Sequence, residues 1–183
     1  MNANDERYLE GLLQATLQGR PTESPAEWAT KNFVFDEPNN HGPFRMLGNE
    51  YVADVLNDFN RPGKTDFALV WGSQTKKTGT LMAGVAWRIV NDPCGMLWVM
   101  PNETLARRFS RQRLQKAFRA TEPVLRLIPT GANHSHFSTL EMLIGGSILN
   151  FTGSNSPANV SSNPCQVVVM DEMDKFSEGS EKE

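Results

Sequence analysis

Residues 67–78, FALVWGSQTKKT, place a short apolar run, a compact polar loop and a Lys-Thr pair one after another. The apolar run of residues 67–70 lies between a turn and a glycine, which predicts a buried β-strand. Residues 78–90 have the periodicity of a helix. A strand, a loop and a helix in this order present backbone N–H groups and a helix N-terminus to a phosphate chain. The stretch therefore predicts an α/β fold with a candidate phosphate-binding loop.

Two positions of this loop depart from the GxxxxGK[ST] pattern of phosphate-binding loops. Trp71 stands in place of the first glycine, and Lys76 in place of the glycine before the lysine. In this pattern Lys77 balances the phosphate charge, as a binding and catalytic residue, and the Thr78 hydroxyl holds Mg²⁺. The candidate nucleotide-binding residues are Gly72, Ser73, Gln74, Thr75, Lys76, Lys77 and Thr78. Taken alone, they fit a basic turn at the start of a helix equally well.

A second constellation is formed by residues 167–172, with the sequence VVVMDE. It consists of an apolar run followed by two carboxylate side chains. The run predicts a buried strand, and ligands of open α/β sheets bind at the C-terminal ends of the strands. Asp171 would hold Mg²⁺ there through water, because Mg²⁺ prefers oxygen ligands and keeps much of its hydration. Glu172 would polarise an attacking water. Taken alone, the pattern fits a core strand followed by a solvated acidic turn.

The two constellations together favour a P-loop ATPase over coincidence, because each ends a predicted buried strand and the phosphate loop comes first. Further strands are expected over residues 96–100 and 147–152, and a helix over residues 103–127 with an interruption near Pro123. Continuous apolar strands that alternate with helices predict a mostly parallel sheet covered on both faces. This is the three-layer αβα arrangement of P-loop NTPases.

The first 62 residues have a different pattern from the rest of the chain. Helices are expected over residues 1–18, from Ser24-Pro25 onward and over residues 48–60. Residues 36–43, DEPNNHGP, have the composition of a loop, as do residues 153–164. The sequence therefore predicts a helical N-terminal segment and lead-in, residues 1–62, followed by a P-loop ATPase core, residues 63–183.

A basic stretch separates the two constellations. Seven basic and two acidic residues lie between Glu103 and Arg126. In a continuous helix with about 100° per residue, four of the arginines share one face. They are Arg107, Arg108, Arg111 and Arg119. This face would contact DNA phosphates, a neighbouring subunit or the nucleotide, and it is equally compatible with an ordinary solvated helix face.

The bulk composition excludes several classes of protein. A net charge of −3 does not mark the whole chain as a nucleic-acid binder, although a local basic face stays possible. The charged N-terminus predicts no signal peptide, and no apolar run approaches the length of a membrane span. Cys94 and Cys165 lack a CxxC spacing and are expected to be reduced thiols. His134 and His136 are expected in a polar loop, because no Cys, Asp or Glu cluster completes a metal site.

Several segments resemble the large terminase subunits of tailed bacteriophages, in particular the lambda-like group. Together they cover most of residues 24–176, and the loop and acidic motifs are the most specific. The segments are residues 24–28 (SPAEW) with 42–45 (GPFR), Gly72-Ser-Gln74 leading to Lys77-Thr78, residues 99–110 (VMPNETLARRFS), and residues 153–158 (GSNSPA) followed by Asp171-Glu172-x-Asp174.

The resemblance implies an ATP-driven motor in the host cell cytoplasm that threads double-stranded DNA into a procapsid. It also implies Mg²⁺ as cofactor, a homo-oligomeric motor, a small terminase subunit and a portal as partners, and a C-terminal nuclease. Lys77 and Thr78 would take the phosphate and metal roles, Asp171 the metal role and Glu172 the catalytic role. The chain ends soon after Asp174, so the C-terminal part of the fold is expected to be missing. Weak nucleotide binding and poor hydrolysis by the 183-residue chain alone follow from that expectation.

Two alternatives stay open. Another P-loop nucleic-acid motor, such as a helicase, would share both motifs. A truncated module that binds nucleotide without turnover would share the fold, and Lys76 in place of glycine favours it.

Overall fold

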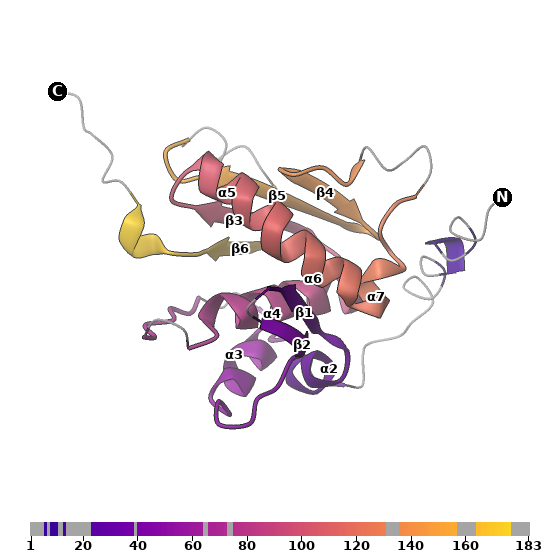
Figure 1. Ribbon diagram of the computed structural model, residues 1–183, viewed down its shortest axis with the longest axis horizontal. Helices are drawn as coiled ribbons and strands as arrows, with labels where there is room; N and C mark the ends of the chain where they lie inside the picture. The colour runs from indigo at the N-terminus through magenta and orange to yellow at the C-terminus, as the bar shows by residue number, and fades with distance from the viewer. Residues whose placement is uncertain are drawn as a thin grey trace.

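The computed structural model describes residues 6, 8–10, 13, 23–38, 40–63, 66–72, 75–130, 136–156 and 164–176 (Figure 1). Most of the helix expected over residues 1–18 lies outside this part of the chain, as do Ser73, Gln74 and residues 157–163 of the second expected loop. Within the described ranges, no helix is both long and apolar enough to cross a membrane.

In the described part of the chain, the main sheet has four strands in the order β4-β5-β3-β6. In its middle, β3 (Gly95–Met100) pairs in parallel with β5 (Ser147–Gly153) and β6 (Val167–Met170). The fourth strand, β4 (Glu141–Ile144), is antiparallel to β5. The expected mixed α/β fold with a mostly parallel sheet is confirmed. β4 is not among the strands expected from the sequence, although Gly145-Gly146 between two apolar runs is a hairpin signal.

The helical layer between β3 and β4 lies in front of the sheet in Figure 1. It consists of α5 (Glu103–Phe109), a π-helical turn η1 (Ser110–Leu114), α6 (Gln115–Ala120) and α7 (Glu122–Leu125). Aromatic packing joins it to the sheet, since the ring centroids of Phe109 and Trp98 are 4.8 Å apart. The helix expected over residues 103–127 is thus confirmed in outline, but a π-helical turn divides it.

The central helix is α4 (Lys77–Asn91), which is buried along most of its length. It packs against α2 (Pro25–Asn32) and α3 (Val52–Asp58) in the lower half of Figure 1. Two glycines permit this close packing. A Cβ atom at Gly84 would lie 2.4 Å from the Phe59 ring, and one at Gly79 would lie 2.9 Å from the Phe35 ring. The N-terminal elements are therefore pressed directly against the helix that carries Lys77 and Thr78.

The prediction of a loop over residues 36–43 is wrong, because most of this segment belongs to a β-hairpin. Its strands, β1 (Val34–Glu37) and β2 (Asn40–Pro43), pair antiparallel. Buried aromatic rings hold it in place. The Phe35 ring lies 5.2 Å from Phe33 and 5.8 Å from Phe44, and all three side chains are buried. Such contacts outweigh the loop propensity of the intervening polar residues.

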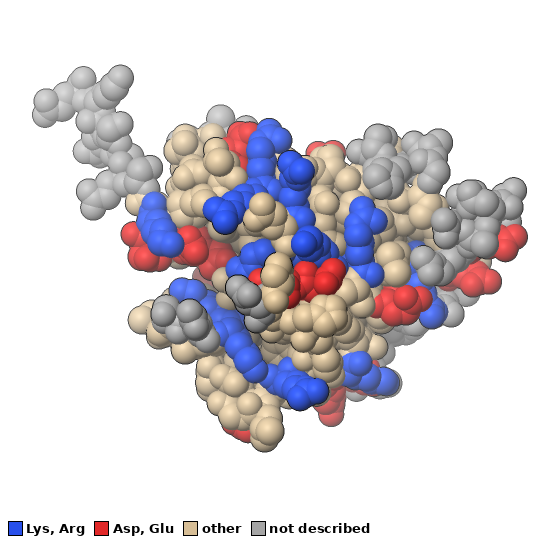
Figure 2. Space-filling view, viewed as in Figure 1, with Lys and Arg blue, Asp and Glu red and all other residues tan. Residues whose placement is uncertain are grey.

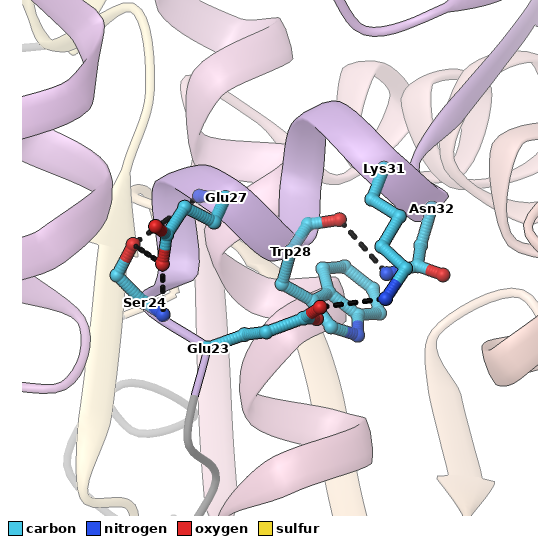
Figure 3. A network of polar contacts seen from close by, with 6 residues as sticks. All are labelled: Glu23, Ser24, Glu27, Trp28, Lys31 and Asn32. Carbon is cyan, nitrogen blue, oxygen red and sulfur yellow. Dashed lines mark hydrogen bonds and ion pairs between the residues drawn. The ribbon is translucent and has the colours of Figure 1, made fainter.

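The start of α2 shows why the helix expected from Ser24-Pro25 forms (Figure 3). The Ser24 hydroxyl accepts a hydrogen bond from the Glu27 N–H, and the Glu27 carboxylate accepts one from the Ser24 N–H. This reciprocal capping box satisfies two helix-end N–H groups, and Pro25 occupies the first turn without losing a hydrogen bond. The ion pair between Lys31 and Glu23 spans the helix at 2.6 Å.

The prediction of a strand over residues 67–70 is wrong. Residues 66–72 have no regular secondary structure, and Val70 is 94% exposed. An extended run becomes a strand only where a neighbour satisfies its backbone N–H and C=O groups. Residues 67–70 pair with none of the described strands. Even β6, which lies at the edge of the sheet, pairs only with β3 among the described strands.

Candidate functional site

Thr78 and Asp171 meet at the start of α4 and the end of β6. The Thr78 hydroxyl Oγ1 donates a hydrogen bond of 2.9 Å to Asp171 Oδ2. The aspartate is placed by the sheet, since its N–H donates to the Val99 carbonyl at 3.1 Å and so extends the pairing of β6 with β3. The loop and the acidic pair, which are distant in the sequence, are therefore brought together.

The Asp171 carboxylate lies in a desolvated position, with only 2% of the residue exposed. Burial raises the pKa of this carboxyl above its usual range, and the negative charge of Glu172 adds to the increase. The Thr78 hydrogen bond and the positive charge of Lys77 act in the opposite direction on the pKa. A buried carboxylate beside a hydroxyl and an ammonium group is a set of groups suited to a hard cation and a phosphate chain.

Two residues next to this pair have a left-handed backbone. Lys76, directly before α4, has φ 62°, and Glu172, directly after Asp171, has φ 57°. They are the positive-φ residues other than glycine in the described part of the chain. Such a conformation is strained for a side chain with a Cβ atom, and strained residues concentrate at functional sites. Lys76 therefore has this backbone at the position where the phosphate-loop pattern has glycine.

The loop before α4 is fastened to the segment between β2 and α3. The Lys76 ammonium Nζ donates to the Arg45 carbonyl at 2.7 Å, and the Tyr51 hydroxyl donates to the Thr75 carbonyl at 3.1 Å. The Tyr51 ring also packs edge-on against Trp71, with 4.8 Å between centroids. Sequence reasoning missed Arg45 and Tyr51, because no sequence pattern links them to a loop more than 20 residues away.

The other candidate residues of the site differ in their surroundings. Lys77 is half-buried and makes no hydrogen bond or ion pair with any residue that the structure describes, so its ammonium group is available to a ligand. The Glu172 carboxylate pairs with Lys175 Nζ at 2.9 Å, within the short 3-10 helix η3 (Met173–Lys175) and its cap. Gly72 is exposed, whereas Ser73 and Gln74 lie outside the described residues.

Lysine and arginine side chains gather over α5 and α6 in Figure 2. Arg107 pairs with Glu103 at 2.7 Å, and the Arg119 guanidinium lies 5.0 Å from the Phe137 ring centroid. Arg108 donates to the side chain of Gln112, and Arg111 is exposed. The turn η1 lies within this stretch, so the uniform rotation expected for a continuous helix does not hold across the four arginines.

The remaining potential metal ligands are the cysteines and histidines. Both cysteines are free, with Cys94 buried and Cys165 half-buried, as expected for reduced thiols. The described ranges contain no group of three or more His, Cys, Asp or Glu side chains that could hold a metal ion. His136 is exposed, and His134 lies outside the described residues.

Comparison with known protein families identifies one matching model, which is described as the ATPase domain of the phage terminase large subunit gpA. The match spans residues 39–183, well over half of the chain. It includes the loop before α4, the acidic pair after β6 and the basic helices between them. Comparisons with curated proteins and with solved structures give no match. The chain belongs to the phage terminase large subunit gpA family, in the ATPase domain of that subunit.

Proposed function

We propose that this chain is the ATPase motor part of a terminase large subunit, which hydrolyses ATP to translocate double-stranded viral DNA into a procapsid. Its core would be a P-loop NTPase of the three-layer αβα type. The observation that carries the proposal is the hydrogen bond between Thr78 and Asp171, because it joins a phosphate-type loop to an acidic strand end. A basic turn and a solvated acidic turn would have no reason to meet in a buried position.

The groups around this hydrogen bond fit a nucleotide. The N-terminus of α4 begins at Lys77, and helix N-terminal N–H groups attract phosphate oxygens. The Lys77 ammonium would bind the phosphates, since no described group competes for it. The loop residues Gly72, Ser73, Gln74, Thr75 and Lys76 would line the phosphate chain.

The same groups fit Mg²⁺ as the accompanying cofactor. The Thr78 hydroxyl and the Asp171 carboxylate offer adjacent oxygen atoms, the ligand type that Mg²⁺ prefers. When bound, Mg²⁺ would neutralise charge on the phosphate oxygens. Asp171 would hold its position through the bond from its N–H to the Val99 carbonyl.

Glu172 is proposed as the residue that orients and deprotonates the attacking water. Its N–H donates to Asp171 Oδ1 at 3.1 Å, and its negative charge raises the pKa of Asp171, which supports a position close to the proposed metal site. Water activation by a carboxylate requires that the carboxylate be free to accept a proton. The Lys175 ion pair would therefore have to open during turnover.

The proposed partners follow from membership in the terminase family. They are double-stranded DNA, the small terminase subunit, the portal of the procapsid, and further copies of the subunit in the assembled motor, all in the host cell cytoplasm. Arg107, Arg108, Arg111 and Arg119 are proposed to contact DNA or a neighbouring subunit. Exposed guanidinium groups on α5 and η1 support this role, because phosphate contacts need accessible cations.

The proposal is tested by titrating a fluorescent ATP analogue with Mg²⁺ into the protein and into Lys77→Ala. Loss of a charge-assisted contact worth ~1.5–3 kcal/mol should weaken binding by about 10- to 100-fold. Lys116→Ala, which removes an exposed lysine of α6, is the matched control and should bind normally. Equal affinity of Lys77→Ala and the unchanged protein would contradict the nucleotide assignment. Tight binding without any DNA-stimulated turnover in the assembled motor would favour a non-catalytic module.

A further inference from the structure

We infer that Tyr51 and Lys76 are positioning residues for nucleotide binding, which clamp the phosphate loop from two sides to the segment between β2 and α3. The inference rests on the proposed function, because it assigns these residues to the same nucleotide site. Neither residue reaches the Thr78–Asp171 pair itself. Each acts through the backbone of the loop, and this distinguishes them from Lys77.

The first side of the clamp is Lys76. Its left-handed backbone turns the side chain away from α4, and its ammonium donates to the Arg45 carbonyl at 2.7 Å. The Lys76 carbonyl meanwhile accepts bonds from the N–H and the hydroxyl of Thr80, the first hydrogen bonds of α4. One residue thus holds the start of the helix with its backbone and a distant carbonyl with its side chain.

The second side is Tyr51. Its hydroxyl oxygen lies 3.1 Å from the Thr75 carbonyl, one residue before Lys76, and 3.0 Å from Asn49 Oδ1, so its single proton is shared between these two acceptors. Its ring contacts Trp71 at the other end of the loop. The Thr75 hydroxyl closes the loop on itself by donating to the Gly72 carbonyl at 2.6 Å. Both ends of the loop are therefore in contact with one tyrosine.

The anchor points of the clamp adjoin residues of the hydrophobic core. Phe44 precedes Arg45, Val52 follows Tyr51, and both are fully buried. Phe44 is further fixed by a bond from its N–H to the Phe33 carbonyl at 2.8 Å. A loop that is held at such points loses less conformational entropy when phosphate binds.

This arrangement compensates for the missing glycine. A glycine at position 76 would adopt the left-handed backbone without strain but would offer no side chain to reach Arg45. The lysine tolerates the strain and supplies the tether. Lys76 therefore positions the loop, whereas Lys77 balances the negative charge of the phosphates.

The experiment measures affinity for the Mg²⁺-bound fluorescent ATP analogue in four variants of the full chain. Tyr51→Phe keeps the ring on Trp71 and loses the hydroxyl, and Lys76→Asn tolerates the left-handed backbone but is too short to reach Arg45. Each should weaken binding about 2- to 10-fold, as loss of one hydrogen bond predicts. Lys76→Arg should restore binding. Lys31→Ala, which removes an exposed lysine of α2 paired with Glu23, is the control and should bind normally.

Two further readouts separate positioning from other roles. The thermal unfolding midpoint should stay unchanged in Tyr51→Phe, while amide hydrogen exchange should become faster at residues 75–78. A lowered midpoint with unchanged exchange, or normal affinity in both Tyr51→Phe and Lys76→Asn, would overturn the clamp. Weak binding in Lys31→Ala would also overturn it, since it would show that loss of any positive charge weakens binding. Lys77→Ala is run alongside. If Lys77→Ala loses affinity while the clamp variants do not, only the clamp proposal is wrong. If Lys77→Ala binds the nucleotide normally, the nucleotide assignment is wrong as well.

Discussion

The Thr78 hydroxyl donates a 2.9 Å hydrogen bond to Asp171 Oδ2 across 93 residues of sequence. The carboxylate that accepts it is almost completely buried and belongs to the end of a parallel strand, whereas the hydroxyl belongs to the first turn of a helix. A metal ion held at this point would be shared between a helix and the sheet. Ligand binding would then couple α4 to β6.

Asp171→Asn should remove the Mg²⁺ dependence of nucleotide binding. The amide keeps the size of the carboxylate but lacks its charge, so the cation loses its anionic ligand. Isothermal titration with ATP at several Mg²⁺ concentrations would measure the change. An affinity that still rises with Mg²⁺ in Asp171→Asn would contradict the metal role of this residue.

The stability of the metal-free protein should depend on pH through Asp171. Because burial raises the pKa of this carboxyl in the folded state, its protonated form favours folding. This contribution is fully present below the carboxyl pKa of the unfolded chain and is lost as the pH rises through the raised pKa of the folded state. Urea unfolding in EDTA across this window should show a decline in the unfolding free energy, and Asp171→Asn should flatten it. An identical pH profile in both proteins would show that Asp171 is not the group responsible.

Glu172→Gln should lower ATP turnover far more than nucleotide affinity. The amide occupies the same space but cannot accept the proton of an attacking water. Single-turnover hydrolysis and nucleotide titration in the assembled motor would separate the two effects. Asp174→Asn, which changes a neighbouring acidic residue, serves as the control. Equal losses of binding and turnover in Glu172→Gln would indicate a structural role instead.

Replacing Arg108 and Arg111 with Ala should flatten the salt dependence of DNA binding. Each lost phosphate contact reduces the slope of log K against log salt by about 0.9, because fewer counterions are released. Fluorescence anisotropy at four salt concentrations would measure the slope. Arg126→Ala removes an arginine paired with Glu122 and should leave the slope near its original value. An unchanged slope in the double variant would indicate that Arg108 and Arg111 lie on an ordinary solvated helix face.

Gly84→Ala should destabilise the fold by about 1–3 kcal/mol, the range of overpacked core substitutions. Its added carbon would meet three atoms of the Phe59 ring at 2.4–2.6 Å, so α4 and α3 would have to separate. Gly79→Ala should cost less, because its contacts with the Phe35 ring are at 2.9 and 3.0 Å. Denaturant unfolding of both variants would check the order, and a larger loss for Gly79→Ala would reverse the packing argument.

The local sequence pattern was sufficient to predict an element where that element is stabilised by its own residues or is buried on all sides. The continuous apolar sequence of β3 predicts a central strand, and Ser24, Pro25 and Glu27 together predict the start of α2. The order of the Lys77-Thr78 and Asp171-Glu172 motifs likewise favours a P-loop ATPase before any contact is known, and further segments within residues 24–176 resemble the terminase family. These features depend on residues close together in the chain, which is why a single sequence carries them.

Tertiary structure alone decided the rest, because the deciding partners are distant in sequence. Residues 67–70 are apolar enough for a strand but have no described strand beside them, and the polar residues 36–43 form a hairpin because buried Phe33, Phe35 and Phe44 pack together. The contacts of Arg45 and Tyr51 with the loop depend on how the N-terminal elements pack on α4. The hydrogen bond from Thr78 to Asp171 exists only once the sheet has placed the end of β6 beside the start of that helix.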